Sequence, residues 1–159
     1  MKYEVRLEAS AGSPIAVVHR QATRPQIGVV VQAACGVVWN ALRAAQVVGV
    51  GRHVAIYWDD TIRLDVGAEV AEPFAGAGEV VGATLPQGML AAVTHFGPYD
   101  QLGGAHQVIQ AWCSANGHRL AGPSWEIYGH WQDEWNRDAA LIRTDVHYLL
   151  ADSANETRD

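Results

Sequence analysis

The sequence is poor in charge and in uninterrupted apolar runs. Only 18% of its 159 residues are charged, and 11 basic against 17 acidic residues give a net charge of 11 − 17 = −6. Without a basic excess, we expect no direct binding of nucleic acid. No run of about 18 apolar residues is free of polar interruption, so we expect no membrane-spanning segment. The first residues alternate in charge and lack an apolar core, which argues against a signal peptide.

Cysteine is also scarce. Cys35 and Cys113 are far apart in the sequence, and each lies in an apolar run typical of a helix. We interpret both as small buried apolar residues rather than as a disulfide. Since 49% of the residues are hydrophobic, the chain has enough apolar surface to fold as a globular domain. These features predict a cytoplasmic protein.

The chain contains an internal repeat. Residues 62–66, IRLDV, return as IRTDV at 142–146, and residues 55–58, AIYW, return as EIYG at 126–129. The offset drifts from 71 (126 − 55) to 80 (142 − 62), while the order of the segments stays constant. A duplicated unit with loop insertions gives this pattern.

We therefore predict one domain, residues 1–151, built from two pseudo-repeats at 1–71 and 79–151. A linker rich in Pro, Gly and Ala joins them at 72–78, and a polar tail follows at 152–159. The predicted fold class is α+β, with ββαββ-like halves, an antiparallel sheet and one main helix in each half. The expected elements are strands at 3–8, 15–21, 53–59 and 62–70 around a helix at 25–48, then strands at 79–85, 88–96, 124–131 and 141–150 around a helix at 100–116.

Turn and capping residues set the expected boundaries. A Gly-Ser-Pro sequence at 12–14 predicts that the first two strands form a hairpin. Pro25 suits a first helical turn, and Gly49 is expected, with the glycine at 51, to end that helix. Asp100 is the expected N-cap of the second helix, and Gly117 is its expected stop.

Three motifs together resemble the GyrI-like family. They are THFGPYDQL at 94–102, GPSWEIY at 122–128 and RTDV at 143–146. This family comprises the effector-binding domains of multidrug-sensing transcription regulators and their free-standing relatives, and the resemblance covers nearly the whole chain. It implies a pseudo-two-fold fold with a central groove that takes up bulky, often cationic, aromatic compounds. Some free-standing relatives resemble hydrolases that open cyclopropane-bearing natural products.

The resemblance implies that Glu126 faces the ligand. Period-two alternation places Glu126 and Tyr128 on one strand face, and the repeat places Tyr57 at the position that matches Tyr128. A carboxylate among aromatic rings loses hydration, so its pKa should rise unless a cation or a hydrogen-bond donor compensates. Without the resemblance, a solvated strand face explains the same pattern.

Further aromatic residues are candidate ligand contacts. Trp131 and Trp135 lie in a loop of 13 residues, where the first repeat has four, and either form a lid or cap the core. Trp39, in the first predicted helix, either reaches the groove or packs in the core. In the last strand, His147 stands where the family usually has Tyr, which makes it a further candidate contact.

The sequence contains no motif for metal binding, dinucleotide binding, serine hydrolysis or DNA binding. The seven histidines show no zinc-binding spacing, so we expect no metal, and no glycine motif predicts a dinucleotide or other cofactor. No Gly-x-Ser-x-Gly element is present. No helix-turn-helix segment precedes the domain, so we do not expect this chain to regulate transcription by contacting DNA directly.

Three functions remain open, of which the third, docking on a protein partner, is motivated only by the family resemblance. The first is binding or sequestration of a bulky aromatic, sometimes cationic, small molecule. The alternative is a protective hydrolase, in which Glu126 acts as general acid or base when water opens a strained electrophile. In both, an unpaired buried carboxylate predicts that Glu126→Gln leaves the fold unharmed or slightly more stable. The sequence identifies no protein partner.

Overall fold

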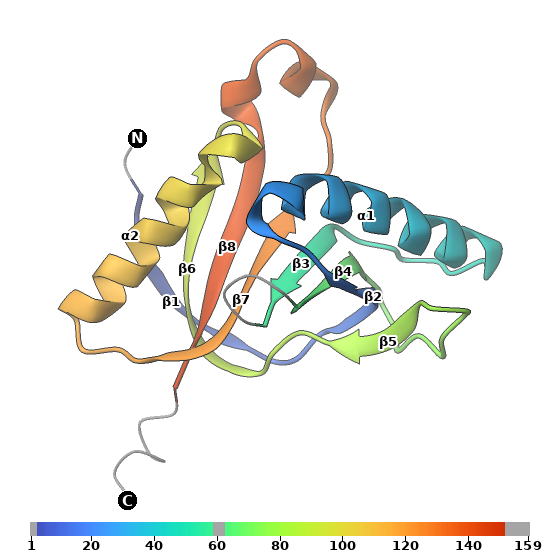
Figure 1. Cartoon of the computed structure of the whole chain (residues 1–159), viewed down its shortest axis with the longest axis horizontal. Helices are drawn as coiled ribbons and strands as arrows, with labels where there is room; N and C mark the ends of the chain where they lie inside the picture. Colours follow the sequence, from blue (N-terminus) through green and yellow to red (C-terminus); the bar gives the residue numbers. More distant parts are fainter. Residues whose placement is uncertain (1–2, 59–62, 152–159) are drawn as a thin grey trace, which may run out of the picture. The chain divides into compact units, whose positions relative to one another are not determined.

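The computed structural model describes residues 3–58 and 63–151; the expected tail and the turn at 59–62 lie outside this range. Within it the chain alternates strands with two long helices (Figure 1). The elements are β1 (Arg6–Ser10), β2 (Pro14–Gln21), α1 (Ile27–Ala44), β3 (His53–Tyr57), β4 (Arg63–Glu69), β5 (Val81–Thr84), β6 (Gly88–Phe96), α2 (Leu102–Ala115), β7 (Leu120–Tyr128) and β8 (Arg143–Leu150). Four short 3-10 turns complete it: η1 (Arg24–Gln26), η2 (Tyr99–Gln101), η3 (Asp133–Asn136) and η4 (Ala139–Leu141).

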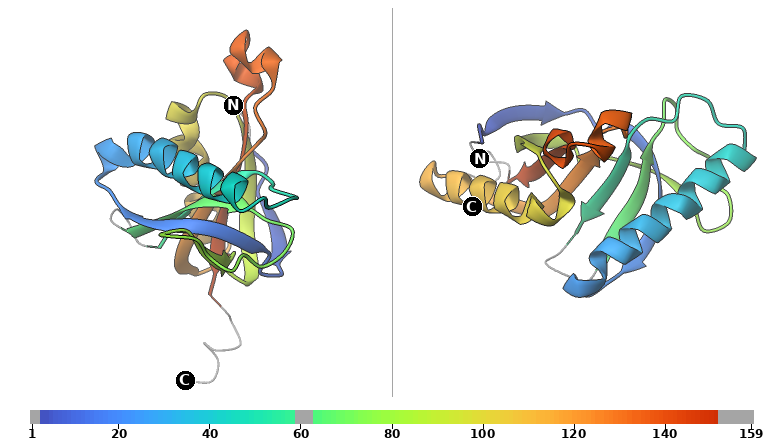
Figure 2. Two further views of the ribbon diagram at one scale, coloured as in Figure 1. Left: turned by 90° about the vertical axis from the view of Figure 1, so that its right-hand side faces the viewer. Right: turned by 90° about the horizontal axis from the view of Figure 1, so that it is seen from above.

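The chain forms two compact units. The discontinuous unit comprises Met1–Ala11 and Pro86–Asp159. Its strands are antiparallel in the order β1-β6-β8-β7, and α2 packs against β6 and β8 (Figure 1). The segment that carries η3 and η4 projects beyond the ends of β7 and β8 (Figure 2). The buried core of this unit is formed by Ala91, Val93, Leu102, Ala105, Ile109, Cys113, Val146 and Tyr148.

The continuous unit is Gly12–Leu85. Its strands are antiparallel in the order β3-β4-β2-β5, and α1 lies along β2 and β4 (Figure 2). Helix α1 buries Ala34, Val38 and Leu42, spaced four residues apart as its apolar pattern predicts. Together with its preceding turn, α1 is long and apolar enough to cross a membrane. The core helix of a soluble protein meets the same two criteria, so length and composition are weak evidence for a membrane span.

The α+β class, the antiparallel pairing and the main helix in each half are confirmed. The predicted hairpin of the first two strands is wrong. Strand β1 pairs with β6, whereas β2 pairs with β4 and β5. Alternating hydrophobicity identifies a strand and its buried face, but packing of residues distant in sequence selects the neighbour. The duplication itself stays a prediction.

Two helix boundaries differ from those expected. Helix α1 ends at Ala44, because Gln46 adopts a left-handed conformation (φ 56°) and the Val47 amide donates to the Leu42 carbonyl. The predicted N-cap Asp100 lies inside η2, and its side chain caps no helix. The predicted stop at Gly117 is confirmed: its φ is 74°, and the next amide donates back into α2.

Candidate functional site

Strand β7 places the predicted acidic residue under α2. Glu126 pairs with Val146 across β7 and β8, and Val146 belongs to the core that α2 covers. Directly paired residues share a sheet face, so Glu126 lies on the face that α2 covers. The exposed fraction of its side chain is 8%.

Both oxygens of the Glu126 carboxylate have partners. The Tyr128 hydroxyl donates to Oε1 at 2.6 Å, as expected for two residues on one strand face. The Nε2 atom of His106, on α2, lies 2.6 Å from Oε2. Since donors to a carboxylate stabilise its ionised form, this carboxylate can stay charged while buried.

The contacts continue from His106 to the last strand. The Nδ1 atom of His106 lies 2.7 Å from the Tyr148 hydroxyl, and the Gln110 amide donates to that hydroxyl at 3.1 Å. We name these five residues, Glu126, Tyr128, His106, Tyr148 and Gln110, the Glu126 cluster. They connect three elements, α2, β7 and β8, through one line of hydrogen bonds.

An aromatic ring borders this cluster. Tyr99, in η2, meets Tyr128 edge to face with ring centroids 5.7 Å apart, and it is 44% exposed. Tyr148 meets the His106 ring edge to face at 5.5 Å. A charged group surrounded by aromatic rings can bind a cation through both charge and the ring faces.

His147 is not brought together with Glu126. It pairs with Trp125, whose side chain alternates with that of Glu126, so both point to the opposite face of the sheet. There the two rings stack, with centroids 5.3 Å apart and an interplanar angle of 13°. Burial lowers the pKa of His147, although Asp145 and Glu8 act in the other direction. Its neighbour Tyr148 shares the face of Glu126.

The two loop tryptophans pack on each other. Their rings meet edge to face at 5.3 Å, and the Trp131 indole donates to Asn136. Trp135 is buried against Gly129, where an added Cβ would lie 3.0 Å from the Trp135 ring, whereas Trp131 is 51% exposed. Trp135 therefore caps the end of β7, and Trp131 keeps an accessible ring.

The two remaining candidates belong to the continuous unit. Tyr57 ends β3 and is half-buried, and Trp39 lies on α1 with 43% of its surface exposed. Trp39 does not point into the core of its unit, which α1 contacts through other positions.

His106 was not predicted as a site residue. The histidines show no metal-binding spacing, so that pattern does not identify it. Its place in the helix does: His106 lies three residues before buried Ile109 and four before Gln110, at the edge of the apolar face. A polar side chain at that edge, facing a strand with a buried carboxylate, is well placed to pair with it. Among the described residues, no group of three or more His, Cys, Asp or Glu side chains could hold a metal ion.

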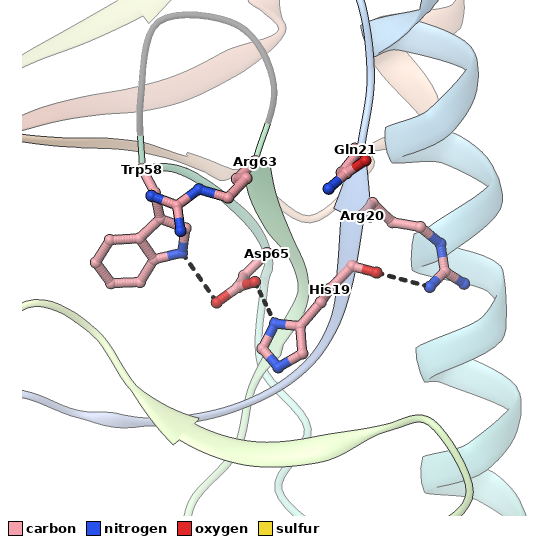
Figure 3. Close-up of a pocket in the computed structure, with 6 residues that line it drawn as sticks. All are labelled: His19, Arg20, Gln21, Trp58, Arg63 and Asp65. Atoms are coloured by element: carbon pink, nitrogen blue, oxygen red, sulfur yellow. Dashed lines mark hydrogen bonds and ion pairs between the residues drawn. The ribbon is translucent and has the colours of Figure 1, made fainter.

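The continuous unit contains an open pocket that the sequence did not predict (Figure 3). Asp65 is buried there; His19 Nδ1 lies 2.5 Å from one of its oxygens, and the Trp58 indole donates to the other at 3.0 Å. In the discontinuous unit, Thr94 donates to Asp145 at the corresponding strand register. In both units, the carboxylate of a buried aspartate therefore has hydrogen-bond partners. The pocket is lined by His19, Arg20, Gln21, Trp58, Arg63 and Asp65.

Small-molecule sites are typically lined by aromatic and apolar side chains with a few polar groups among them, as at Glu126. A family model, the GyrI-like small molecule binding domain, matches residues 3–146. The chain belongs to this GyrI-like family. Comparison with curated proteins gives no match.

Solved structures share the fold. The C-terminal domain of EcmrR superposes with a TM-score of 0.76 at 17% identity, covering 95% of this chain and 99% of that domain. SAV2435 bound to tetraphenylphosphonium gives a TM-score of 0.64 at 9% identity, with 99% of each chain covered. A hydrolase from Listeria innocua gives 0.62 at 11% identity, covering 93% and 92%. EcmrR is also seen in a complex with DNA, where this chain corresponds to 57% of the EcmrR chain.

Proposed function

We propose that this protein binds bulky aromatic small molecules, cations among them, at the Glu126 cluster, and that it does so in the cytoplasm without a metal or cofactor. The function of the protein is then to bind or sequester the compound. The protein itself does not contact nucleic acid or a membrane directly. Membership of the GyrI-like family supports the small-molecule part of this proposal. The likeness to SAV2435 bound to tetraphenylphosphonium supports an aromatic cation as the ligand.

The observation that carries the proposal is the buried Glu126 carboxylate with two short contacts and aromatic neighbours. Its present partners, His106 and Tyr128, are polar side chains that an entering cation can replace or supplement. A cation then gains attraction from the carboxylate and from the faces of the tyrosine rings, in surroundings from which water is largely excluded. A neutral compound of the same shape gains only the apolar contacts.

We further propose that Trp131 and Trp135 are candidate aromatic contacts for the ligand, and Trp131 is the stronger of the two because its ring is substantially exposed. The contacts expected of Tyr57 and Trp39, which belong to the continuous unit, stay predictions. We expect Tyr148, rather than its neighbour His147, to contact the ligand, because Tyr148 shares the sheet face of Glu126.

Calorimetric titration with two matched probes tests this function. Tetraphenylphosphonium is a permanent cation, and triphenylphosphine oxide is a neutral aromatic compound of similar shape. We expect Glu126→Gln to weaken binding of the cation at least tenfold, about 1.4 kcal/mol, and to change binding of the neutral probe much less. Glu134→Gln, at an exposed position in η3, is the control. Absence of binding for both probes, or equal losses for both, contradicts the proposal.

The alternative is a protective hydrolase that opens cyclopropanoid or similar electrophilic compounds. The contact of Glu126 with His106, which continues to Tyr148, favours it, because this line of hydrogen bonds can accept and return a proton while water is added. Chromatography of such a compound incubated with wild type and Glu126→Gln separates the two functions. Conversion beyond one equivalent by wild type alone indicates an enzyme, whereas tight binding of an unchanged compound indicates a receptor.

A further inference from the structure

The turn after β6 places Tyr99 against the Glu126 cluster. Tyr99 is the first residue of η2, and its ring meets that of Tyr128 edge to face at 5.7 Å. Tyr99 is also 44% exposed, so it combines contact with the cluster and access to solvent. Whatever fixes the turn at 97–98 therefore also fixes an accessible aromatic ring beside Glu126.

A buried histidine on β6 contacts this turn. His95 is fully buried, and its two ring nitrogens have partners from different segments of the chain. Nε2 lies 3.2 Å from the Pro98 carbonyl oxygen, and Nδ1 lies 2.8 Å from the Tyr3 hydroxyl. Because a carbonyl oxygen can only accept, Nε2 carries the proton and donates it to Pro98. In the neutral ring, Nδ1 is then the acceptor, and the Tyr3 hydroxyl donates to it.

The backbone of the turn permits this contact. Gly97 has a φ of 143°, which favours glycine, and a Cβ added there would lie 3.2 Å from Nε2 of His95. The Gly97 amide donates to the Ile142 carbonyl at 2.8 Å, which ties the turn to the chain that leads into β8. The Pro98 carbonyl also accepts from the Gln101 amide at 3.1 Å, within η2. One carbonyl thus joins the imidazole to the 3-10 turn that carries the tyrosine.

The other partner of His95 belongs to the segment before β1. The Tyr3 ring stacks on the imidazole, with centroids 5.9 Å apart and an interplanar angle of 24°, and it packs against the core that α2 covers. A Cβ added at Gly104, near the start of α2, would lie 3.7 Å from the Tyr3 hydroxyl oxygen. Tyr3 therefore lies against both the helix and the imidazole, and it holds the ring in the orientation that directs Nε2 to Pro98.

His95 and the ring that Tyr99 contacts lie in one row across the sheet. His95 pairs with Thr144 on β8, and Thr144 pairs with Tyr128 on β7. Directly paired residues share a face, so all three side chains lie on the face that α2 covers. Tyr99 meets the last residue of this row, and the carbonyl just before Tyr99 in the chain meets the first. The turn therefore contacts both ends of the row.

We propose that His95 is a positioning residue of the ligand site, which holds Tyr99 beside Tyr128 through the Pro98 carbonyl. This inference rests on the proposed function of the site. His95 is buried and acts through the turn, whereas Tyr99 supplies an accessible ring to an aromatic ligand. Loss of the hydrogen bond to Pro98 should therefore release Tyr99 and weaken binding, although every residue of the Glu126 cluster is still present.

Two substitutions of His95 separate its two contacts. His95→Gln places an amide nitrogen near the position of Nε2 and can still donate to Pro98, whereas His95→Asn has its polar atoms near the position of Nδ1. In calorimetric titrations with tetraphenylphosphonium, His95→Asn should lower the affinity at least about threefold, and His95→Gln should stay within about twofold of wild type. Thr144→Val, in the same row, is the control and should bind as wild type, because the Thr144 hydroxyl has no hydrogen-bond partner among the described residues. Equal losses in His95→Gln and His95→Asn overturn the proposal.

A second background distinguishes positioning of Tyr99 from a general loss of structure. Tyr99→Ala removes the ring and should weaken binding of the cation about tenfold. In that background, His95→Asn should cause no further loss of affinity, because no ring remains to be positioned. The same loss with and without Tyr99 contradicts the proposal, since His95 would then act on the site by another route.

Measurements without ligand keep the inference falsifiable if no probe binds or the His95 variants fail to fold. In wild type, the ¹⁵N shifts of the His95 imidazole should show the proton on Nε2, and nuclear Overhauser effects should connect the rings of Tyr99 and Tyr128. A neutral ring with its proton on Nδ1 overturns the proposal, because it cannot donate to Pro98, and so does absence of the ring contact. Absence of probe binding by wild type instead rejects the proposed function, and the tautomer and the ring contact then decide about His95.

Discussion

The Nε2 atom of His106 lies 2.6 Å from the Oε2 atom of Glu126, although the two residues are 20 positions apart and come from a helix and a strand. This contact fixes α2 to β7 by a polar interaction at the edge of an otherwise apolar interface. A buried carboxylate requires such partners, since ionised groups without them are expelled from apolar surroundings or neutralised. The contact therefore has a structural effect that is measurable apart from any ligand.

Glu126→Gln should destabilise the free protein. An unpaired carboxylate would have made this substitution neutral or stabilising, but the structure gives Glu126 two short contacts, with Tyr128 and His106. A glutamine loses the charge and can accept with only one side-chain oxygen. We expect the free energy of unfolding to fall by about 1–2 kcal/mol, measured by chemical denaturation at pH 7.5. The exposed control Glu134→Gln should change it by less than about 0.5 kcal/mol. A variant as stable as wild type would contradict the paired geometry.

His147 should make the protein less stable in mild acid. Burial lowers its pKa from the ordinary value of 6.5, so below that pH the unfolded chain binds a proton that the folded chain does not. Stability from this group is therefore complete above pH 6.5 and is lost as the pH falls toward the lower, folded pKa. One such group changes the free energy of unfolding by at most about 1.4 kcal/mol per pH unit.

Replacement of His147 by phenylalanine isolates this contribution. His147→Phe keeps a ring to stack on Trp125 but removes the titration. Unfolding free energies between pH 5 and 7.5 should depend less steeply on pH in this variant than in wild type. His130→Phe, at an exposed position, is the control and should keep the wild-type slope. Equal slopes for wild type and His147→Phe would show that His147 accepts its proton as readily when folded as when unfolded.

The sequence predicted what depends on local patterns. The apolar spacing of Ala34, Val38 and Leu42 identified the buried face of α1, and Gly117 marked the end of α2. The alternation of Glu126 and Tyr128 correctly placed both on one strand face, where they now form a hydrogen bond. Each of these predictions requires only residues within a few positions of one another.

What the sequence left open depends on distant partners. The β1 strand was identified, but its neighbour β6 is more than 75 positions away, and a three-residue connection to β2 suggested a hairpin instead. The same limit applies to the site: nothing near Glu126 in sequence indicates that His106 faces it. On β8, the candidate His147 lies one position from Tyr148, which faces Glu126, and a shift of one residue changes the face of every side chain in a strand.

Cys35 should react slowly with thiol reagents. It lies on α1, half-buried, and burial raises its pKa to about 11. Because the thiolate is the reactive form, its fraction near pH 7.5 is about 100-fold lower than for a thiol of ordinary pKa. In a Cys113→Ala variant, where Cys35 is the only thiol, alkylation by iodoacetamide should be about 100-fold slower than for a model thiol. The rate should rise about tenfold per pH unit up to pH 10. A rate that levels off near pH 8.5 would contradict the raised pKa.

Two glycines of the continuous unit should respond in opposite ways to replacement by alanine. Gly36 lies inside α1, and a Cβ added there meets no atom within 4 Å. Gly67 lies in β4 opposite Val17, and a Cβ there would fall 1.7 Å from the Ala16 carbonyl oxygen. Since that oxygen belongs to the backbone of the paired strand, the clash can be relieved only by moving β2 away from β4.

Gly36→Ala should therefore stabilise the protein by about 0.5–1 kcal/mol, because alanine restricts the unfolded chain and favours the helix. Gly67→Ala should destabilise it by several kcal/mol, on the order of the largest single-residue effects, or prevent folding. Thermal melts of wild type and both variants at the same pH compare the two effects. If Gly67→Ala melts at the wild-type temperature, β2 and β4 do not approach as closely as the structure shows. If Gly36→Ala is destabilised, the exposed side of α1 is in contact with something that leaves no room for a methyl group.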